Sequence, residues 1–263
     1  MEVKEITKDL AYPIVYDNHY SKVMPRLTKH YLGIFDENKL VGVLTLGWGT
    51  QPKGTINKLF PGCTSDDYYE IGKMCMLEEM PRNSESQMLS LVIRWMKRNT
   101  DKKFLYTWAD GIVGKPGYVY QAANFMYGGF IWTDIYVGPD GEKIHPRSSK
   151  DLLKENAKMM KKEKLFWLTS DFMKMKKIRR IKGKQFRYIY PLTKTARKML
   201  KQSTVEWNLN YPKHEDLQWK DATDKGKSMI LDEMPEMDLS VVNVNSKNVN
   251  SHLINNPLAA LLE

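Results

Sequence analysis

The chain has 263 residues, of which 42% are hydrophobic and 11% aromatic, so it has enough apolar side chains for a sizeable core and wholesale disorder is excluded. Lysine and arginine number 41 against 31 acidic residues, a net charge of +10, and this excess favours a polyanionic partner such as nucleic acid. The two cysteines, Cys63 and Cys75, are too few for a disulfide framework and lack the spacing of a zinc site.

The N-terminal residues 1–10 contain no signal-peptide core, and the longest apolar runs are only strand-sized. We therefore expect a soluble cytoplasmic protein with no membrane partner. Hydrophobic periodicity and turn residues mark the elements that follow. In chain order they are a helix over 8–20 broken at Pro13, a hairpin over 31–49 that turns at 36–39, a short helix over 55–60, a strand over 68–77, a helix from Ser84 to Asn99, a strand over 102–110, a helix over 117–127, a strand over 128–137, a strand over 184–192 and a helix over 193–201.

This order predicts one sheet. Strands that alternate with helices, together with an antiparallel hairpin, are typical of an α/β or α+β domain with a single mixed central sheet flanked by helices. We expect that domain to cover 1–213, with a basic helical insert at 150–183. From 214 to 263 the pattern decays into an acidic, Asn-rich stretch, which we interpret as a partly mobile extension whose last residues, 256–263, form a short helix.

The positive charge is concentrated in one part of the chain. Between Lys150 and Leu200 there are 17 basic and four acidic residues, interleaved with aromatic and methionine side chains. Cations for phosphates beside aromatic rings for bases are what a nucleic-acid groove needs, although a membrane surface or an acidic protein would also fit such charge. The predicted nucleic-acid-binding residues are Lys161, Lys162, Lys164, Lys176, Lys177, Arg179, Arg180 and Lys182.

The segment from Tyr68 to Ser90 is the most informative. It is predicted to be a strand, a Pro-Arg-Asn turn and a helix capped by Ser84. The free N–H groups at a helix start, with a fixed positive charge beside them, suit a phosphate or pyrophosphate. We therefore predict a binding site for a phosphate-bearing donor at Arg82, Asn83, Ser84 and Ser86, although an ordinary cap beside a surface arginine has the same pattern.

Taken together, these segments resemble the Mom family of phage DNA-modifying proteins. The similar stretches, in the family's order, are NHYSKVMP, LGIFDENKLVGVLTLG, EIGKMCMLEEMPRNSESQMLSLVIRWMK, YTWADGIVGKPGYVYQAANFMYGG and FRYIYPLTKTARKML followed by NYPK. They cover most of 15–213, and the PRNSES and ADG…YQAANF blocks are the specific ones. The chain departs from the family at Thr107-Trp108-Ala109-Asp110, where the family has a Tyr-Ala-Asp pattern, and in its longer basic insert and tail.

The resemblance implies an N-acetyltransferase-like (GNAT) fold and a function. It implies an acyltransferase-like enzyme that places a carbamoylmethyl or acyl-derived group on the exocyclic amine of adenine in double-stranded DNA, so that restriction enzymes no longer cut. It also implies a donor of the acyl-CoA type at the Arg82 turn, and action in the host cytoplasm if a phage encodes the chain. A metal requirement and the oligomeric state, monomer or homodimer, stay open.

Four residues are the candidates for catalysis. His19, which matches the family's His-Tyr-Ser, would take the proton from the adenine amine if its pKa is near neutral, or hold the donor together with Tyr20. Asp110 follows a strand, where ligand-binding groups are often presented, and would orient the amine or a base. Tyr120 would protonate a leaving thiolate, as a tyrosine on this helix often does in GNAT enzymes. Glu70 is a weaker candidate for a base with a raised pKa.

Modification of a base within duplex DNA requires that the base leave the stack. The candidates to sandwich it are Trp48, Tyr106, Trp108, Phe125 and Trp132. Two other functions remain compatible with the sequence. One is an acetyltransferase that acts on a protein or a small-molecule amine. The other is a non-catalytic DNA-binding counter-defence protein.

Overall fold

A computed structural model describes residues 1–144 and 150–238. The helices are α1 (Lys8–Asn18), α2 (Pro52–Leu59), α3 (Ser84–Asn99), α4 (Tyr118–Ala122), α5 (Lys150–Met159), α6 (Ser170–Met175) and α7 (Lys194–Met199). The strands are β1 (Glu2–Ile6), β2 (Leu27–Asp36), β3 (Lys39–Trp48), β4 (Tyr68–Met76), β5 (Phe104–Ala109), β6 (Met126–Val137), β7 (Lys143–Ile144), β8 (Arg179–Pro191), β9 (Trp219–Asp221) and β10 (Met229–Leu231).

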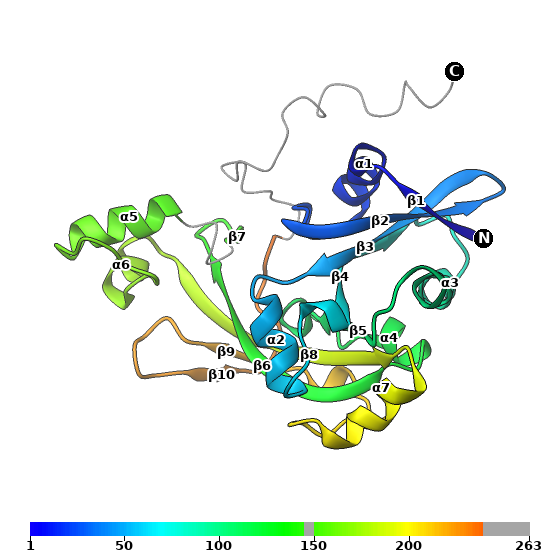
Figure 1. The fold of residues 1–263 in the computed structure, drawn as a ribbon. Coiled ribbons are helices and arrows are strands. Elements are labelled where there is room, and N and C mark those ends of the chain that lie inside the picture. The colour runs from blue at the N-terminus through cyan, green and yellow to red at the C-terminus, as the bar shows by residue number, and fades with distance from the viewer. Residues whose placement is uncertain (145–149, 239–263) are drawn as a thin grey trace.

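All these strands belong to one sheet, which confirms the expected fold class. Its order is β1-β2-β3-β4-β5-β8-β6-β7, and β9 pairs with both β8 and β10. Among the described strands, β4 and β5 form the only parallel pair, and the other paired strands are antiparallel. Helices cover both faces (Figure 1). No helix in the described part of the chain is both long enough and apolar enough to span a bilayer.

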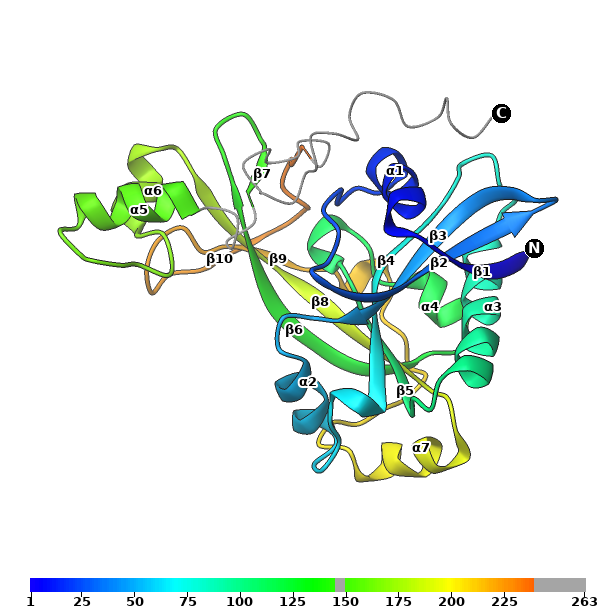
Figure 2. The same ribbon diagram turned by 45° about the horizontal axis from the view of Figure 1, so that its top comes forward.

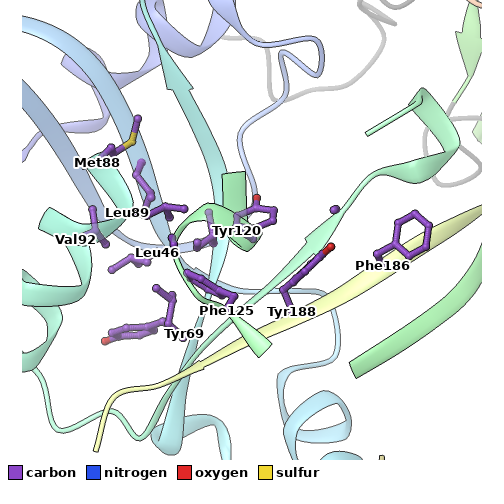
Figure 3. Packing of buried hydrophobic residues seen from close by; sticks show 14 of the residues in the cluster. Leu46, Tyr69, Met88, Leu89, Val92, Tyr120, Phe125, Phe186 and Tyr188 are labelled. Carbon is purple, nitrogen blue, oxygen red and sulfur yellow. The ribbon is translucent and has the colours of Figure 1, made fainter. Parts of the chain in front are cut away.

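The two faces of the sheet have separate cores because neighbouring strand residues point to opposite sides. Leu44, Leu46 and Tyr69 pack with Leu89 and Val92 of α3 in the main core. On the other face, Val43 and Cys75 pack against α1, and Tyr68, Phe104 and Tyr106 pack with side chains of α2 and α7. Figure 3 shows the α3 side of the main core.

Two predicted elements differ in the structure. α1 runs through Pro13 without a break, although a proline in a helix interior removes a backbone hydrogen bond and is disfavoured there. α4 is shorter than the predicted helix over 117–127. Gly117 and Asn124 flank it with positive φ angles of 97° and 58°, and the chain enters β6 at Met126.

The basic insert is a projecting arm that is helical only in part. We use "the arm" for residues 150–178, which comprise α5, the loop 160–169 and α6, together with the residues that lead to β8. The arm lies at the far end of β6 and β8, apart from the other helices (Figures 1 and 2). The expectation of helix up to 183 is wrong, because from Arg179 onward the backbone pairs with β6.

The described part of the predicted extension packs on the domain. β9 is hydrogen-bonded to β8, and Leu217 and Trp219 are buried in the main core. Trp219 Nε1 also donates a hydrogen bond to the carbonyl of Ile112, at 2.9 Å. The Asn-rich segment and the predicted terminal helix at 256–263 lie outside the described residues.

Candidate functional site between the diverging strands β4 and β5

The parallel strands β4 and β5 pair over only three residues each and then separate. The paired positions are Tyr68 with Phe104, Tyr69 with Leu105 and Glu70 with Tyr106. Beyond them, β4 pairs with β3 alone and β5 with β8 alone. A cavity of about 980 Å³ lies in this opening. Its lining includes Glu70 and Trp108 as well as Arg82 at the start of α3, so the cavity reaches from the α1/α2 face of the sheet to the α3 face.

A bulge in β4 brings two ionisable side chains to the same face. Ile71 lies opposite Leu46 and Lys73 lies opposite Thr45, so Gly72 is an extra residue in β4. In a regular strand, Glu70 and Lys73 would be three positions apart and would point to opposite faces, because the side chains of a strand alternate. With the extra residue, both line the cavity.

Tyr20 and Asp110 join the end of α1 to the end of β5. The Tyr20 hydroxyl donates to Asp110 Oδ2 at 2.9 Å. Burial, followed by the nearby Asp110 charge, raises the pKa of Tyr20 well above its ordinary value. Tyr20 is therefore a neutral phenol that keeps its proton and donates a hydrogen bond to the Asp110 side chain. Both residues line the cavity.

His19 stacks on Tyr20 with 4.5 Å between the ring centroids, and its Nδ1 accepts the backbone N–H of Ser21 at 2.9 Å. Burial, and then the charges of Lys73, Lys115 and Lys143, lower its pKa to about 3. The expectation of a near-neutral pKa is therefore wrong. Since Nδ1 is an acceptor, the proton of the neutral ring lies on Nε2, which makes His19 a hydrogen-bond donor and a poor base near pH 7.

Glu70 has the proton affinity that His19 lacks. It lies where the strands begin to separate, and its carboxylate accepts the Gly49 N–H at 3.2 Å. Burial raises its pKa to about 7, against the weaker opposing effect of that hydrogen bond. A carboxylate with a pKa near the working pH suits general base catalysis.

Lysine side chains surround the Tyr20 end of the cavity. Lys73 is buried, its Nζ donates to the Ser21 carbonyl at 2.6 Å, and burial lowers its pKa to about 8. The Nζ atoms of Lys115 and Lys143 lie 4.3 Å and 5.6 Å from the centre of the Tyr20 ring. Asp110 is the carboxyl group that acts on both Lys73 and Lys115, so this end of the cavity is rich in positive charge and suits an anionic or carbonyl group.

The start of α3 supplies the opposite end of the cavity. Arg82, Asn83 and Ser86 line it, but Ser84 does not. The helix cap is Asn83, which has a left-handed backbone and no side-chain capping bond. Ser84 is instead the first helical residue, is 2% exposed, and donates its hydroxyl to the Pro81 carbonyl at 2.6 Å. The predicted cap at Ser84 is therefore wrong, and its hydroxyl points away from the cavity.

Tyr120 is a buried cavity residue. It packs between Phe125 and Tyr188, with centroid distances of 5.6 Å and 5.5 Å, and Figure 3 shows it among the core side chains. Burial raises its pKa, so its phenol holds a proton at neutral pH. Tyr118, also in the cavity lining, is 52% exposed.

Of the five aromatic residues predicted to stack on the displaced adenine, Trp108 alone lines the cavity. Tyr106 and Phe125 are fully buried core residues. Trp48 donates Nε1 to the carbonyls of Ser65 and Tyr68, and Trp132 lies under the ammonium group of Lys220. One face of the Trp108 ring is already covered, because the Arg187 guanidinium lies 5.2 Å from the ring centre.

The eight predicted nucleic-acid-binding residues divide into two groups. Lys176 pairs with Glu155 at 2.6 Å, Arg179 with Asp221 at 3.0 Å, and Arg180 and Lys182 with Asp134. Within the described residues, the other four form no ion pair and are exposed; they are Lys161, Lys162, Lys164 and Lys177.

The lysines of the cavity were not predicted from the sequence. Lys73 reaches it through the Gly72 bulge and Lys115 through a loop. Lys143, in the short strand β7, lies beside the Tyr20 ring, so no extended strand or helix period marks any of the three. In the described part of the chain, no cluster of three or more His, Cys, Asp or Glu side chains is arranged to hold a metal ion.

A model of the Mom protein family matches residues 1–213. The chain is 29% identical over 203 residues to methylcarbamoylase mom of Escherichia phage Mu, and the alignment covers 76% of this chain and 79% of the relative. Among solved structures, an N-acetyltransferase from Staphylococcus aureus Mu50 matches with a TM-score of 0.36 and 13% identity, over 73% of this chain and 97% of that one.

Proposed function

The chain belongs to the Mom protein family, and from this premise we propose that it is a transferase that adds a small carbamoylmethyl or acyl-derived group to the exocyclic amine of adenine in DNA, which protects the DNA from restriction. The phage Mu relative is named a methylcarbamoylase. The observation that carries the proposal is the cavity between β4 and β5. Its lining brings together the Glu70 carboxyl group as a proton acceptor, the Trp108 ring as an aromatic wall, and the start of α3 beside Arg82 as a place for an anion.

The chemistry requires a base. The lone pair of the adenine amine is delocalised into the ring, so the amine is a poor nucleophile until its proton is removed. Glu70, with a pKa of about 7, accepts that proton as the new N–C bond forms. The neutral His19 and the Tyr20–Asp110 pair position the reacting groups and do not take the proton themselves.

The adenine must enter the cavity after it has rotated out of the stacked duplex. A volume of about 980 Å³ is at the upper end of ordinary small-molecule sites, large enough for a purine and a small donor group side by side. Trp108 offers one ring face for the purine to stack on. Double-stranded DNA is held by the exposed lysines of the arm, in the cytoplasm of the host cell.

An acyl-CoA-type donor fits the residues at the start of α3. Arg82 makes no ion pair within the described residues, and the N–H groups of Glu85 and Ser86 have no acceptor there. These groups, with Asn83, would hold the phosphates of the donor. When bound, such a donor would supply an activated acyl carbon with a thiolate leaving group, and would so give the acyl-derived adduct of the two proposed. Tyr120, protonated and buried in the cavity wall, would be the residue placed to give a proton to that leaving group.

The proposal is tested by mass spectrometry of nucleosides from DNA of cells that express the chain. We expect a new deoxyadenosine adduct whose added mass is absent from cells without the chain. Unmodified nucleosides, obtained from cells with folded protein, would contradict the proposal. An acetylated protein or small-molecule amine in the same cells would favour the alternative acetyltransferase, and DNA binding with no adduct would favour the non-catalytic alternative.

A further inference from the structure

The loop 160–169 of the arm carries two large aromatic side chains that face solvent. Phe166 is 70% exposed and Trp167 is 59% exposed, and their ring centroids are 6.5 Å apart. Adjacent exposed aromatic side chains are unfavourable in water and usually mark a contact surface. Neither residue belongs to the cavity lining.

The chain beside the two rings is firmly held. Leu168, the next residue, is 2% exposed, and its N–H donates to the Tyr136 hydroxyl at 3.1 Å. Asn156 is fully buried, and its side chain accepts the Thr169 N–H at 2.7 Å and donates to the Thr169 hydroxyl at 2.9 Å. The rings are therefore presented by an anchored loop and do not contribute to the small core of the arm.

The charge around the rings identifies the partner as a polyanion. Lys161, Lys162 and Lys164 are exposed and form no ion pair in the described part of the chain, and Glu163 is the one acidic residue among them. Lys164 Nζ lies 4.9 Å from the centre of the Phe166 ring. Cations beside flat rings match the phosphates and bases of a nucleic acid.

The arm is joined directly to the cavity by one strand. β8 begins at Arg179, immediately after the arm, and carries Gln185 into the cavity lining. The six residue steps of β8 from Arg179 to Gln185 span about 20 Å, so a duplex that places one displaced base in the cavity is long enough to reach the arm, whereas a membrane surface has no such connection to the site. This favours DNA over lipid as the partner of the exposed rings.

We infer that Phe166 and Trp167 form a wedge that enters a base step of the DNA duplex while the neighbouring lysines hold its backbone. Apolar side chains inserted in this way unstack and kink a duplex, which lowers the cost of moving a base out of the stack. The inference rests on the proposed function, because the wedge serves to displace the base that is modified. Unwinding of the duplex and formation of the adduct are measured separately, so one can be contradicted while the other stands.

The test is the relaxation of closed circular plasmid by topoisomerase in the presence of the whole protein. A wedge unwinds the duplex, so the wild-type protein shifts the linking number of the relaxed plasmid. We expect the double variant Phe166→Ala/Trp167→Ala to lose this shift and to bind duplex about tenfold more weakly or worse, with the same dependence on salt. The matched control is Met175→Ala, which removes a 58% exposed side chain of α6 and should keep the wild-type shift.

Three results would overturn the wedge. The first is a linking-number shift that is equal in the double variant and the wild type, and the second is the absence of a shift from a wild-type protein that binds DNA. The third is loss of binding to vesicles of anionic phospholipid in the double variant with DNA binding unchanged, which would assign the rings to a membrane. An unwinding wild-type protein that yields no deoxyadenosine adduct would support the wedge and contradict the proposed function. Circular dichroism and thermal unfolding check that both variants are folded.

Discussion

Glu70 combines burial with a position at the point where β4 and β5 separate, and its pKa of about 7 places its titration near physiological pH. If it is the base, the rate rises with pH through about 7 and levels off above it. Glu70→Gln, which keeps the shape but binds no proton, should lower the rate of adduct formation about 100-fold or more. Glu78→Gln, at an exposed position after β4, is the control, and equal rates in both variants would exclude Glu70 as the base.

The same residue affects stability in a predictable direction. The pKa of Glu70 is higher in the folded protein, about 7, than its ordinary value of 4.5, so the folded state binds the proton more tightly. The folded state therefore loses stability as pH rises from about 4.5 through 7. Glu70→Gln avoids this loss and should be more stable than the wild type at pH 8, by on the order of 1–3 kcal/mol. Denaturant unfolding at pH 5 and pH 8 measures the difference.

Substitutions at His19 test whether this residue positions the reacting groups or acts as a base. Its Nδ1 accepts the Ser21 N–H, and an asparagine carbonyl oxygen is able to take that place. We expect His19→Asn to retain activity within about tenfold of the wild type and His19→Ala to lose more, because the segment that holds Lys73 through the Ser21 carbonyl loosens. Equal losses in both variants, with an acid limb near pH 6 in the wild-type rate, would show that His19 titrates as a base.

Several individual residues of the site were predictable from the sequence. Motif positions predicted His19, Tyr20, Arg82, Asn83, Ser86, Asp110 and Tyr120, and all of them line one cavity. The pKa of His19 was not predictable, because it depends on three lysines that come from separate parts of the chain. The place of Lys73 was not predictable either, because it depends on a single-residue bulge in the pairing of β3 with β4.

Among the elements, the arm and the start of β8 carry basic residues of two kinds, exposed and ion-paired. Neutralising the exposed set, Lys161, Lys162 and Lys164, should lower the slope of log affinity against log salt by about 0.9 for each phosphate that the variant no longer neutralises. Neutralising the paired set, Lys174, Lys176 and Arg179, should change the slope little. Fluorescence anisotropy of a labelled duplex at several salt concentrations measures both, and equal slopes for the two triple variants would remove the arm loop from the DNA interface.

The elements with a strong local signal were predicted and those without one were not. The hairpin of β2 and β3 turns at Glu37 and Asn38, both with positive φ, as its turn residues indicated. α3 has a clear apolar stripe and matches its predicted range. β1 and β9 were missed because they are short strands whose place is fixed by pairing with β2 and β8, which are distant in sequence.

For the whole molecule, the described residues beyond 213 are part of the folded domain. Trp219 is 6% exposed and hydrogen-bonded to Ile112. Trp219→Ala should cost about 3–5 kcal/mol, which corresponds to a fall of roughly 10 °C in the unfolding midpoint. Met229→Ala, at a 66% exposed position on β10, should leave the midpoint near the wild-type value, and an equal midpoint for both variants would show that the core does not depend on this strand.

The overall arrangement shows the limit of prediction from a single sequence. Alternating helices and strands indicated one mixed sheet, which is correct. The order of strands was not available, because β8 inserts between β5 and β6 and no local pattern records that long-range pairing. The cavity depends on this order, since β5 is held by β8 on one side and is free to separate from β4 on the other.

The proposed function places the modified adenine in the cavity between β4 and β5. The most direct measurement is a structure of the Glu70→Gln protein bound to duplex DNA, with the location of the displaced base as its readout. We predict an adenine stacked on Trp108, with its exocyclic nitrogen within hydrogen-bond distance of the side chain at position 70. An adenine that stays paired in the duplex, or that lies in the separate cavity of about 780 Å³ beside Trp207, would contradict this claim.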